Sequence, residues 1–241
     1  MHDADIAKLY GSAERIDNAS MCRAIFLRHK DTISVQKPDI ALPRLQAILE
    51  AALNLSNRRG FDAMSLRDLC EASGMSIGGL YAYVDGKTML LKMILTEVTC
   101  VVDAVLSNPP EGVTHDPEAY LRWLIDAHLR LTEDLLPWFT FAFMEAKTFP
   151  RAERQMAIDS EALTEQHFAD VIRDGIARGR FRADTSDLLP ALIKPLLQDW
   201  YVKRSKYRRR GVTLESYSAT VQDIVLTACL PLPCHGHDPA A

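Results

Sequence analysis

The stretch SLRDLCEASGMSIGGLYAYVDGKTMLL, residues 65–91, carries two adjacent glycines where the surrounding pattern favours a helix. Gly78 and Gly79 each cost roughly 1 kcal/mol relative to alanine in a helix interior. Ser65 begins the stretch and an acid, Asp68, follows three residues later, which is the pattern of a capping box. We therefore expect two short helices joined by the turn SGMS, with both glycines inside the second helix.

A preceding helix completes a helix-turn-helix unit. Residues 43–60 place Leu45, Ile48 and Leu49 at helical spacing, and Gly60 is the expected C-cap. In such a unit the second of the paired helices enters the DNA major groove. A glycine there removes the Cβ that would hold the backbone away from DNA. The alternative is that the glycines mark a loop with no ligand.

The rest of the chain is also helical in pattern. Apolar residues recur every three or four positions, and the alternation typical of strands is nearly absent. This predicts an all-α fold in which Pro195 should kink the helix that contains it. The further helices are expected at residues 85–107, 117–133, 137–147, 150–178, 186–209 and 213–229.

Composition restricts the class of protein. The 241 residues are 48% hydrophobic and 25% charged, as in one large or two small globular domains. No run of about 18 apolar residues suggests a membrane span, and the N-terminus lacks the apolar core of a secretory signal. Five cysteines without framework spacing indicate free thiols in a reducing compartment. We expect a cytoplasmic protein.

Charge and pattern divide the chain into four parts. The net charge is −4, but residues 41–95 hold six basic and five acidic side chains, whereas residues 96–241 hold 16 and 21. The acidity thus belongs to the C-terminal part. We expect an N-terminal accessory segment with two short helices, a DNA-binding domain, a ligand-binding and dimerisation domain, and a disordered tail, at residues 1–42, 43–95, 96–229 and 230–241.

Residues 43–95 resemble the DNA-binding region of the TetR family of bacterial transcriptional regulators. The matching positions are Gly74, Met75, Ser76, Gly78, Leu80, Tyr81, Tyr83, Lys87, Leu90 and Leu91. The resemblance implies phosphate contacts at Ser65, Ser76 and Lys87, phosphate or sugar contacts at Tyr81 and Tyr83, and base-facing positions at Ile77, Gly79 and Ala82.

Two of these positions depart from the family. Position 77 is often polar or basic and position 79 is often threonine, but this chain has Ile77 and Gly79. Bidentate base readout by arginine or asparagine is therefore missing from this helix. Ile77 suits a thymine methyl group. Specificity then rests more on DNA shape or on residues outside the helix.

In the TetR family the helices after the DNA-binding unit surround an effector cavity. The aromatic stretch WFTFAFM, residues 138–144, fits such a wall, although ordinary core packing is the alternative. His128 is either a polar anchor for the effector or a satisfied core histidine. We expect an apolar or aromatic effector, and poor binding of highly charged ligands because nothing inside would neutralise them. The expected ligand-binding residues are Trp123, His128, Phe139, Phe143, Met144 and Phe168.

The last two helices are the expected dimer interface. Two such pairs, one from each chain, would form a four-helix bundle. The apolar residues expected on this face are Leu189, Leu192, Leu196, Leu214, Tyr217, Val221, Ile224 and Val225.

The functional expectation is a dimeric repressor that a small effector releases from double-stranded operator DNA. No catalytic or nucleotide-binding motif is present, so neither enzymatic activity nor a cofactor is expected. The tail CLPLPCHGH matches no zinc spacing, and the basic run at residues 203–210 is typical of a solvated helix end. The alternative is a helical protein–protein interaction module without sequence-specific DNA binding.

Overall fold

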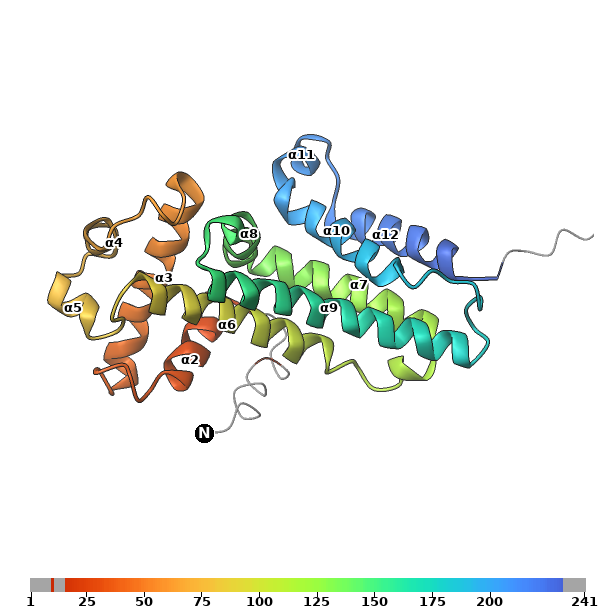
Figure 1. Ribbon diagram of the computed structural model, residues 1–241, viewed down its shortest axis with the longest axis horizontal. Coiled ribbons are helices and arrows are strands. Elements are labelled where there is room, and N and C mark those ends of the chain that lie inside the picture. Colours follow the sequence, from red (N-terminus) through yellow and green to blue (C-terminus); the bar gives the residue numbers. More distant parts are fainter. Residues whose placement is uncertain (1–9, 11–15, 232–241) are drawn as a thin grey trace, which may run out of the picture.

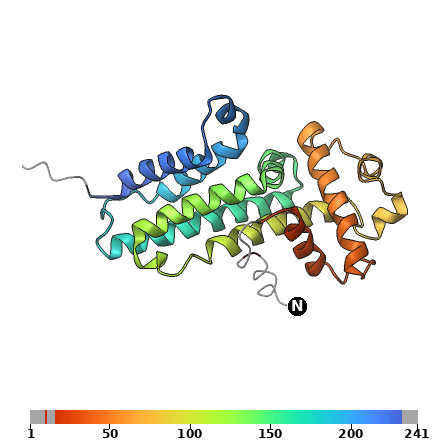
Figure 2. The same cartoon turned by 180° about the vertical axis from the view of Figure 1, so that it is seen from behind.

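The computed structural model describes Tyr10 and residues 16–231. The N-terminal helices lie at one end of an elongated molecule, and the C-terminal helices make up the rest (Figure 1; Figure 2 shows the back). No strand occurs in the described part, and the predicted all-α fold is confirmed. The first predicted helix, through residues 6–16, and nearly all of the predicted disordered tail lie outside the described residues.

The N-terminal end consists of α3 (Pro38–Arg59), α4 (Leu66–Ser73) and α5 (Ile77–Tyr81). α3 starts five residues before the predicted position, because Pro38 occupies the first turn, where a missing N–H costs nothing. The helix then continues through Pro43. It ends at Gly60, whose φ of 85° favours glycine, as predicted.

Local capping determines where α4 and α5 begin. The Ser65 hydroxyl accepts a hydrogen bond from the Asp68 N–H at 3.1 Å, and the Asp68 carboxylate accepts one from the Ser65 N–H at 2.8 Å. The predicted capping box is thus confirmed. Gly74, with φ of 69°, ends α4, and the Ser76 hydroxyl caps α5 by accepting from the Gly79 N–H at 3.1 Å. α5 ends at Tyr81, three residues before the end of the helix IGGLYAYV, residues 77–84, that the sequence pattern predicts.

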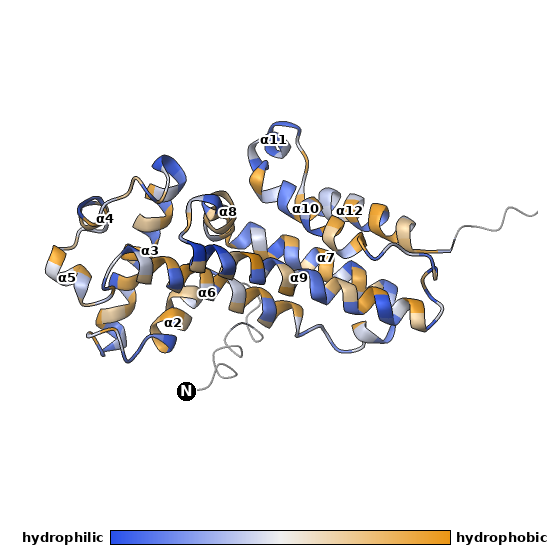
Figure 3. Cartoon of the chain, in the orientation of Figure 1, coloured by the Kyte–Doolittle hydropathy of each residue, from blue (hydrophilic) through white to orange (hydrophobic). Residues whose placement is uncertain are grey.

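The long helix α6 (Lys87–Leu106) connects the two ends of the molecule. α2 (Asn18–Arg28) packs against both α3 and α6. The C-terminal block contains α7 (Pro117–Asp134), α8 (Leu136–Met144), α9 (Arg151–Ala177), α10 (Leu189–Val202), α11 (Arg204–Arg209) and α12 (Leu214–Cys229), with two short 3₁₀ turns, η1 (Val113–His115) and η2 (Ala146–Thr148). Hydrophobic and hydrophilic stripes alternate around the long helices, as expected where each buries one face (Figure 3).

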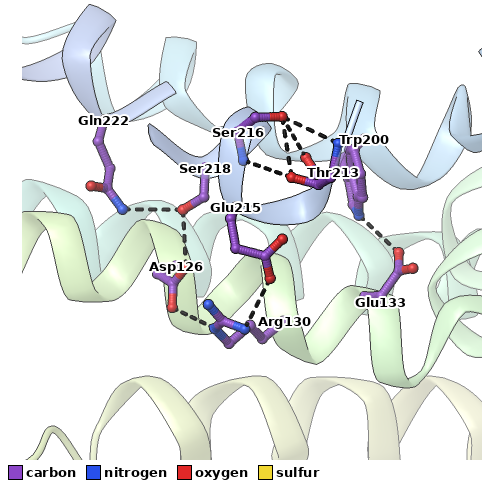
Figure 4. A network of polar contacts seen from close by, with 9 residues as sticks. All are labelled: Asp126, Arg130, Glu133, Trp200, Thr213, Glu215, Ser216, Ser218 and Gln222. Carbon is purple, nitrogen blue, oxygen red and sulfur yellow. Dashed lines mark hydrogen bonds and ion pairs between the residues drawn. The ribbon is translucent and has the colours of Figure 1, made fainter. Parts of the chain in front are cut away.

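α10 and α12 pack on each other and on α7. The helix predicted over residues 186–209 is divided in two at Lys203, although it runs through Pro195. Polar contacts fasten α12 to α7 (Figure 4). The Ser218 hydroxyl of α12 donates to the Asp126 carboxylate of α7 at 3.0 Å, and Arg130 of α7 forms an ion pair with Glu215 of α12 at 3.8 Å. These contacts fix which face of α12 turns inward.

The inward face of α12 contradicts part of the predicted dimer surface. Val221 is only 2% exposed and Val225 is fully buried, because the helical period turns both toward their own chain. Two predicted positions, Leu192 and Ile224, are exposed, and Leu188 is a further exposed apolar side chain on this layer. The other predicted positions, Leu189, Leu196, Leu214 and Tyr217, are half-buried.

The segment GIARGRF, residues 175–181, closes α9 by a close approach. A Cβ on Gly175 would lie 2.1 Å from the buried ring of Phe181, so only glycine lets this ring pack against the helix. Gly179, with φ of 67°, then makes the turn out of α9. None of the helices described is both long and apolar enough to cross a membrane.

Candidate DNA-binding and effector sites

The outer face of α5 is exposed and partly apolar. The side chains of Ile77 and Tyr81 are both about half exposed. They are four residues apart, so they lie on the same face of the helix, one turn from each other. Ser76 and Gly78 are exposed beside them. This face is the part of the helix-turn-helix unit that is available to a DNA groove.

The two glycines of α5 differ in their surroundings. A Cβ added at Gly78 would have no atom within 4 Å among the residues described. A Cβ added at Gly79 would lie 3.2 Å from the Ser76 hydroxyl and 3.4 Å from the Met75 methyl group. The backbone at Gly78 is therefore open to an approaching molecule, whereas Gly79 faces atoms of its own chain. We accordingly place the proposed close approach to DNA at Gly78.

The variant Gly78→Ala tests this placement. The alanine should stabilise the folded protein by up to about 1 kcal/mol, because it favours the helix and meets no neighbour. It should nonetheless weaken binding to operator DNA about tenfold, since its methyl group stands between the backbone and the groove. Thermal unfolding and fluorescence anisotropy with a labelled duplex measure the two effects. Gly79→Ala is the matched control, and a larger loss of DNA affinity in the control contradicts the placement.

The position of Tyr83 contradicts its predicted contact with phosphate or sugar. Its side chain is 2% exposed, because it packs three residues after the buried Leu80 on the same helical face. Its hydroxyl meets no hydrogen-bond partner in the part of the chain that is described. Burial raises the pKa of Tyr83, an effect that the nearby Arg44 guanidinium opposes.

Lys87 and Ser65 are held by their own chain to different degrees. The Lys87 ammonium donates to the Asp62 carbonyl at 3.1 Å and lies 4.8 Å from the centre of the Phe61 ring. An ammonium has three donors, so Lys87 keeps capacity for a phosphate at the start of α6. The Ser65 hydroxyl donates to the Asp68 carboxylate at 2.7 Å. That negative charge makes Ser65 the less favourable phosphate contact.

Ala82, a predicted base-facing position, is half-buried at the C-cap of α5. Its carbonyl accepts a hydrogen bond from the Ser34 N–H at 2.8 Å.

Sequence reasoning also missed basic residues beside the helix-turn-helix unit. Arg59 forms an ion pair with Asp68 at 3.4 Å and remains largely exposed. Further exposed cations on α3 and α4 are Arg44, Arg58 and Arg67. The sequence could have indicated these residues, because each is an arginine at an outward position of a helix. Arginines at such positions can contact the phosphates of DNA.

A cavity of about 160 Å³ lies between α6, α8, α9 and α10. Its apolar lining consists of Leu95, Val98, Val102, Phe139, Ala142, Phe143, Ala146, Ala157, Ile158 and Tyr201. Phe143 and Tyr201 meet edge to face, with their ring centres 6.1 Å apart. The polar and charged groups of the lining are Thr99, Arg154, Ser160, Glu161, Thr164, Lys194 and Gln198.

Two of the six predicted ligand residues line this cavity, namely Phe139 and Phe143. The other four lie outside this lining. Trp123 packs against Tyr120 on α7, with ring centres 5.9 Å apart, and Phe168 is fully buried in the core. Met144 is exposed outside the lining, because α8 turns this end of the aromatic stretch outward. His128 is fully buried, and its Nε2 lies 3.2 Å from the Lys194 ammonium, which separates it from the cavity.

Lys194 is the functional candidate that the sequence reasoning missed. Its side chain is 7% exposed and belongs to the cavity lining. Burial lowers the pKa of this ammonium to about 8, and the carboxylates of Glu161 and Glu165 act in the opposite direction. This corrects the expectation that nothing inside would neutralise an anion. A single lysine in the apolar run LPALIKPLL was the available signal.

Known proteins share this architecture. The sequence model of bacterial regulatory proteins, tetR family, matches residues 48–94. The uncharacterized HTH-type transcriptional regulator YfiR of Bacillus subtilis is 26% identical over 144 residues, which are 58% of this chain and 68% of YfiR. The crystal structure of the TetR family regulator PfmR from Thermus thermophilus superposes with a TM-score of 0.65 at 26% identity, over 75% of this chain and 97% of PfmR.

A more distant structure has the same fold. FadR from Bacillus subtilis, whose structure is a complex with stearoyl-CoA, gives a TM-score of 0.60 at 14% identity, over 76% of this chain and 97% of FadR. The family match falls on the helix-turn-helix unit, and the structural matches extend it through the C-terminal helices. Residues 48–94 thus form a DNA-binding domain of the tetR family, and the chain as a whole is similar to TetR-family proteins, which are transcriptional regulators and not enzymes.

Proposed function

We propose that this regulator is a homodimeric repressor, which a small effector in the α6–α8–α9–α10 cavity releases from its operator. The observation that carries the proposal is the continuity of α6. Its first residue, Lys87, lies at the helix-turn-helix unit, and two or more turns further along it supplies Leu95, Val98 and Val102 to the cavity wall. A ligand that moves this wall therefore acts on the DNA-binding end through one rigid helix.

Within this proposal the chain has the four parts expected from the sequence. Residues 43–95, together with the earlier start of α3, bind DNA, and residues 96–229 bind the effector and dimerise. The DNA contacts that the exposure of α5 supports best are Ser76, Ile77, Gly78 and Tyr81, with Lys87 at the start of α6. A repressor acting on bacterial operators works in the cytoplasm.

The dimer is proposed to form through α10 and α12. Leu188, Leu192 and Ile224 are exposed apolar side chains on this layer. Paired with a second copy, the two helices make a four-helix bundle that covers them. The dimer then presents two α5 helices to half-sites about 34–36 Å apart, one turn of DNA. Effector binding changes the tilt of α6 and so removes this match.

A release assay tests the proposal. Protein bound to a fluorescent duplex from its own promoter region is titrated with apolar, monoanionic and polyanionic metabolites, and anisotropy reports release. Complete release requires an effector that prefers the free state about 10⁴-fold. Phe143→Ala should abolish release while leaving operator affinity unchanged, since Phe143 lines the cavity and belongs to α8, which lies apart from α5 (Figure 1). Release by polyanions alone, or full response of Phe143→Ala, contradicts the proposal.

A further inference from the structure

The Lys194 ammonium is a buried cation at a cavity wall. Among the residues described, its hydrogen-bond partner is the Nε2 atom of His128, 3.2 Å away, and no carboxylate lies within ion-pair distance. A buried charge that is neither paired nor fully hydrogen-bonded is costly. An anionic group in the cavity would supply the missing counter-charge.

His128 holds Lys194 in place. Burial lowers the pKa of this histidine well below its usual range, and the neighbouring ammonium lowers it further. The ring is therefore neutral, and its Nε2 atom accepts one of the three N–H donors of Lys194. The remaining two donors are available to a ligand. His128 itself does not line the cavity, so its role is to position the lysine.

The charges around the cavity favour one negative charge on the ligand. The Glu161 carboxylate lies in the same lining and accepts a hydrogen bond from Gln198 at 2.6 Å. It would repel a second anionic group. Arg154 also belongs to the lining, but its side chain is exposed and donates to the Phe149 carbonyl at 3.0 Å. Lys194 is thus the buried cation available to a ligand in this lining.

The size of the cavity limits the rest of the ligand. A volume of about 160 Å³ is close to that of the apolar cavities, of about 150 Å³, that hold a benzene molecule. We propose that the cavity binds a compact monocarboxylic acid, with its carboxylate on Lys194 and an apolar body of about one ring against Phe139, Phe143 and Val98. This inference names the effector class and rests on the proposed function.

Calorimetry on the free protein tests the ligand class directly. The probes are benzoate and hexanoate, each compared with its uncharged amide, benzamide or hexanamide. At pH 7 each carboxylate should bind at least about tenfold more tightly than its amide, which is the size of one charge-assisted hydrogen bond. Equal affinities of acid and amide overturn the proposal, as does the absence of binding by either carboxylate.

The variant Lys194→Met separates charge from packing. It should lose the preference for the carboxylates while keeping the affinity for the amides, because methionine fills a similar volume without the charge. Its thermal midpoint should not fall, since replacing an unpaired buried charge by an apolar group is neutral or stabilising. Lys203→Met is the control: Lys203 ends the same helix, is exposed and pairs with Asp199. Unchanged carboxylate affinity in Lys194→Met overturns the proposal.

The pH dependence of binding is a second readout. Because the pKa of Lys194 is lowered to about 8, benzoate affinity should be highest at neutral pH and fall as the pH rises through 8. The titratable groups that act on Lys194 from the packed helices are His128 on α7 and Glu161 and Glu165 on α9. α8 carries no titratable side chain. A profile that is flat in the wild type contradicts the assignment.

These measurements need no DNA, so their outcome is separate from the release assay. Binding of benzoate without any release of operator would retain the carboxylate site and contradict the proposed effector mechanism. If an uncharged apolar compound releases the operator and no carboxylate binds, the release mechanism is supported. The assignment of a carboxylate ligand is then overturned.

Discussion

Exchange of Leu192 for aspartate is expected to convert a dimer into folded monomers and to lower operator affinity by about 100-fold or more. Leu192 is 59% exposed in the single chain, so the carboxylate costs the monomer little. In a four-helix bundle of two chains it would be buried without a partner, at a cost of several kcal/mol. A monomer contacts only one half-site. It therefore loses the increase in DNA affinity that comes from linking two binding units, which is about 10²–10⁴-fold.

Light scattering and anisotropy with a promoter duplex measure both parts of this prediction. Leu163→Asp is the matched control, because Leu163 is an exposed leucine of α9 outside the α10–α12 layer. It should leave the dimer and its affinity intact. Val221→Asp should instead unfold the chain, since Val221 is buried in its own core. A Leu192→Asp variant that stays dimeric at micromolar concentration contradicts the proposed interface.

Local chemistry made most of the helices predictable from the sequence. The SLRD box and Gly60 determine helix ends through contacts within a few residues, so their pattern is readable without a structure. The start of α3 is harder to predict from the sequence, because two prolines so close together, Pro38 and Pro43, disfavour one continuous helix, although Pro38 suits a first turn. The inward direction of Val221 depends on how α12 is fastened to α7, which the sequence pattern alone does not contain.

In the candidate sites too, features set by local sequence can be predicted, whereas features set by tertiary packing cannot. Exposure of Ile77 and Tyr81 follows from the helical period of one short helix, so it can be predicted from the sequence of that helix alone. The cavity is built from four helices distant in sequence, so apolar character at Trp123 or Phe168 did not distinguish core from cavity wall. Lys194 needed the same tertiary information, because its neighbour His128 lies 66 positions earlier in the chain.

The described part of the accessory segment, Tyr10 and residues 16–42, contributes to the packed core, a role that the sequence did not assign. Glu97 on α6 is fully buried and accepts hydrogen bonds from the Tyr10 hydroxyl at 2.5 Å and from Arg28 at 3.3 Å. Burial, and then the Glu97 carboxylate, raise the pKa of Tyr10 above its usual value. α2 also reaches α8, where the Trp138 indole donates to Asn18 at 2.8 Å. Tyr10 and α2 thus hold α6 and α8 in place at the junction of the two proposed domains.

The variant Glu97→Ala is expected to lower the free energy of unfolding by about 3–5 kcal/mol, the usual cost of removing one partner of a buried ion pair. The alanine removes the carboxylate that Tyr10 and Arg28 share and leaves a space inside α6's packed face. Urea denaturation followed by circular dichroism measures the loss. Glu97→Gln, which keeps an acceptor oxygen of the same reach, should lose less.

Glu118→Ala is the control for this comparison. Glu118 pairs with Arg122 at 3.1 Å in a partly exposed pair one turn apart on α7, and such pairs contribute only about 0.3–0.5 kcal/mol. A loss in Glu97→Ala no larger than in the control would show that the Glu97 contacts do not hold the segment. With the expected loss, deletion of residues 1–28 should destabilise the protein at least as much, because it removes Tyr10 and Arg28 together with the buried Ile25 and Phe26.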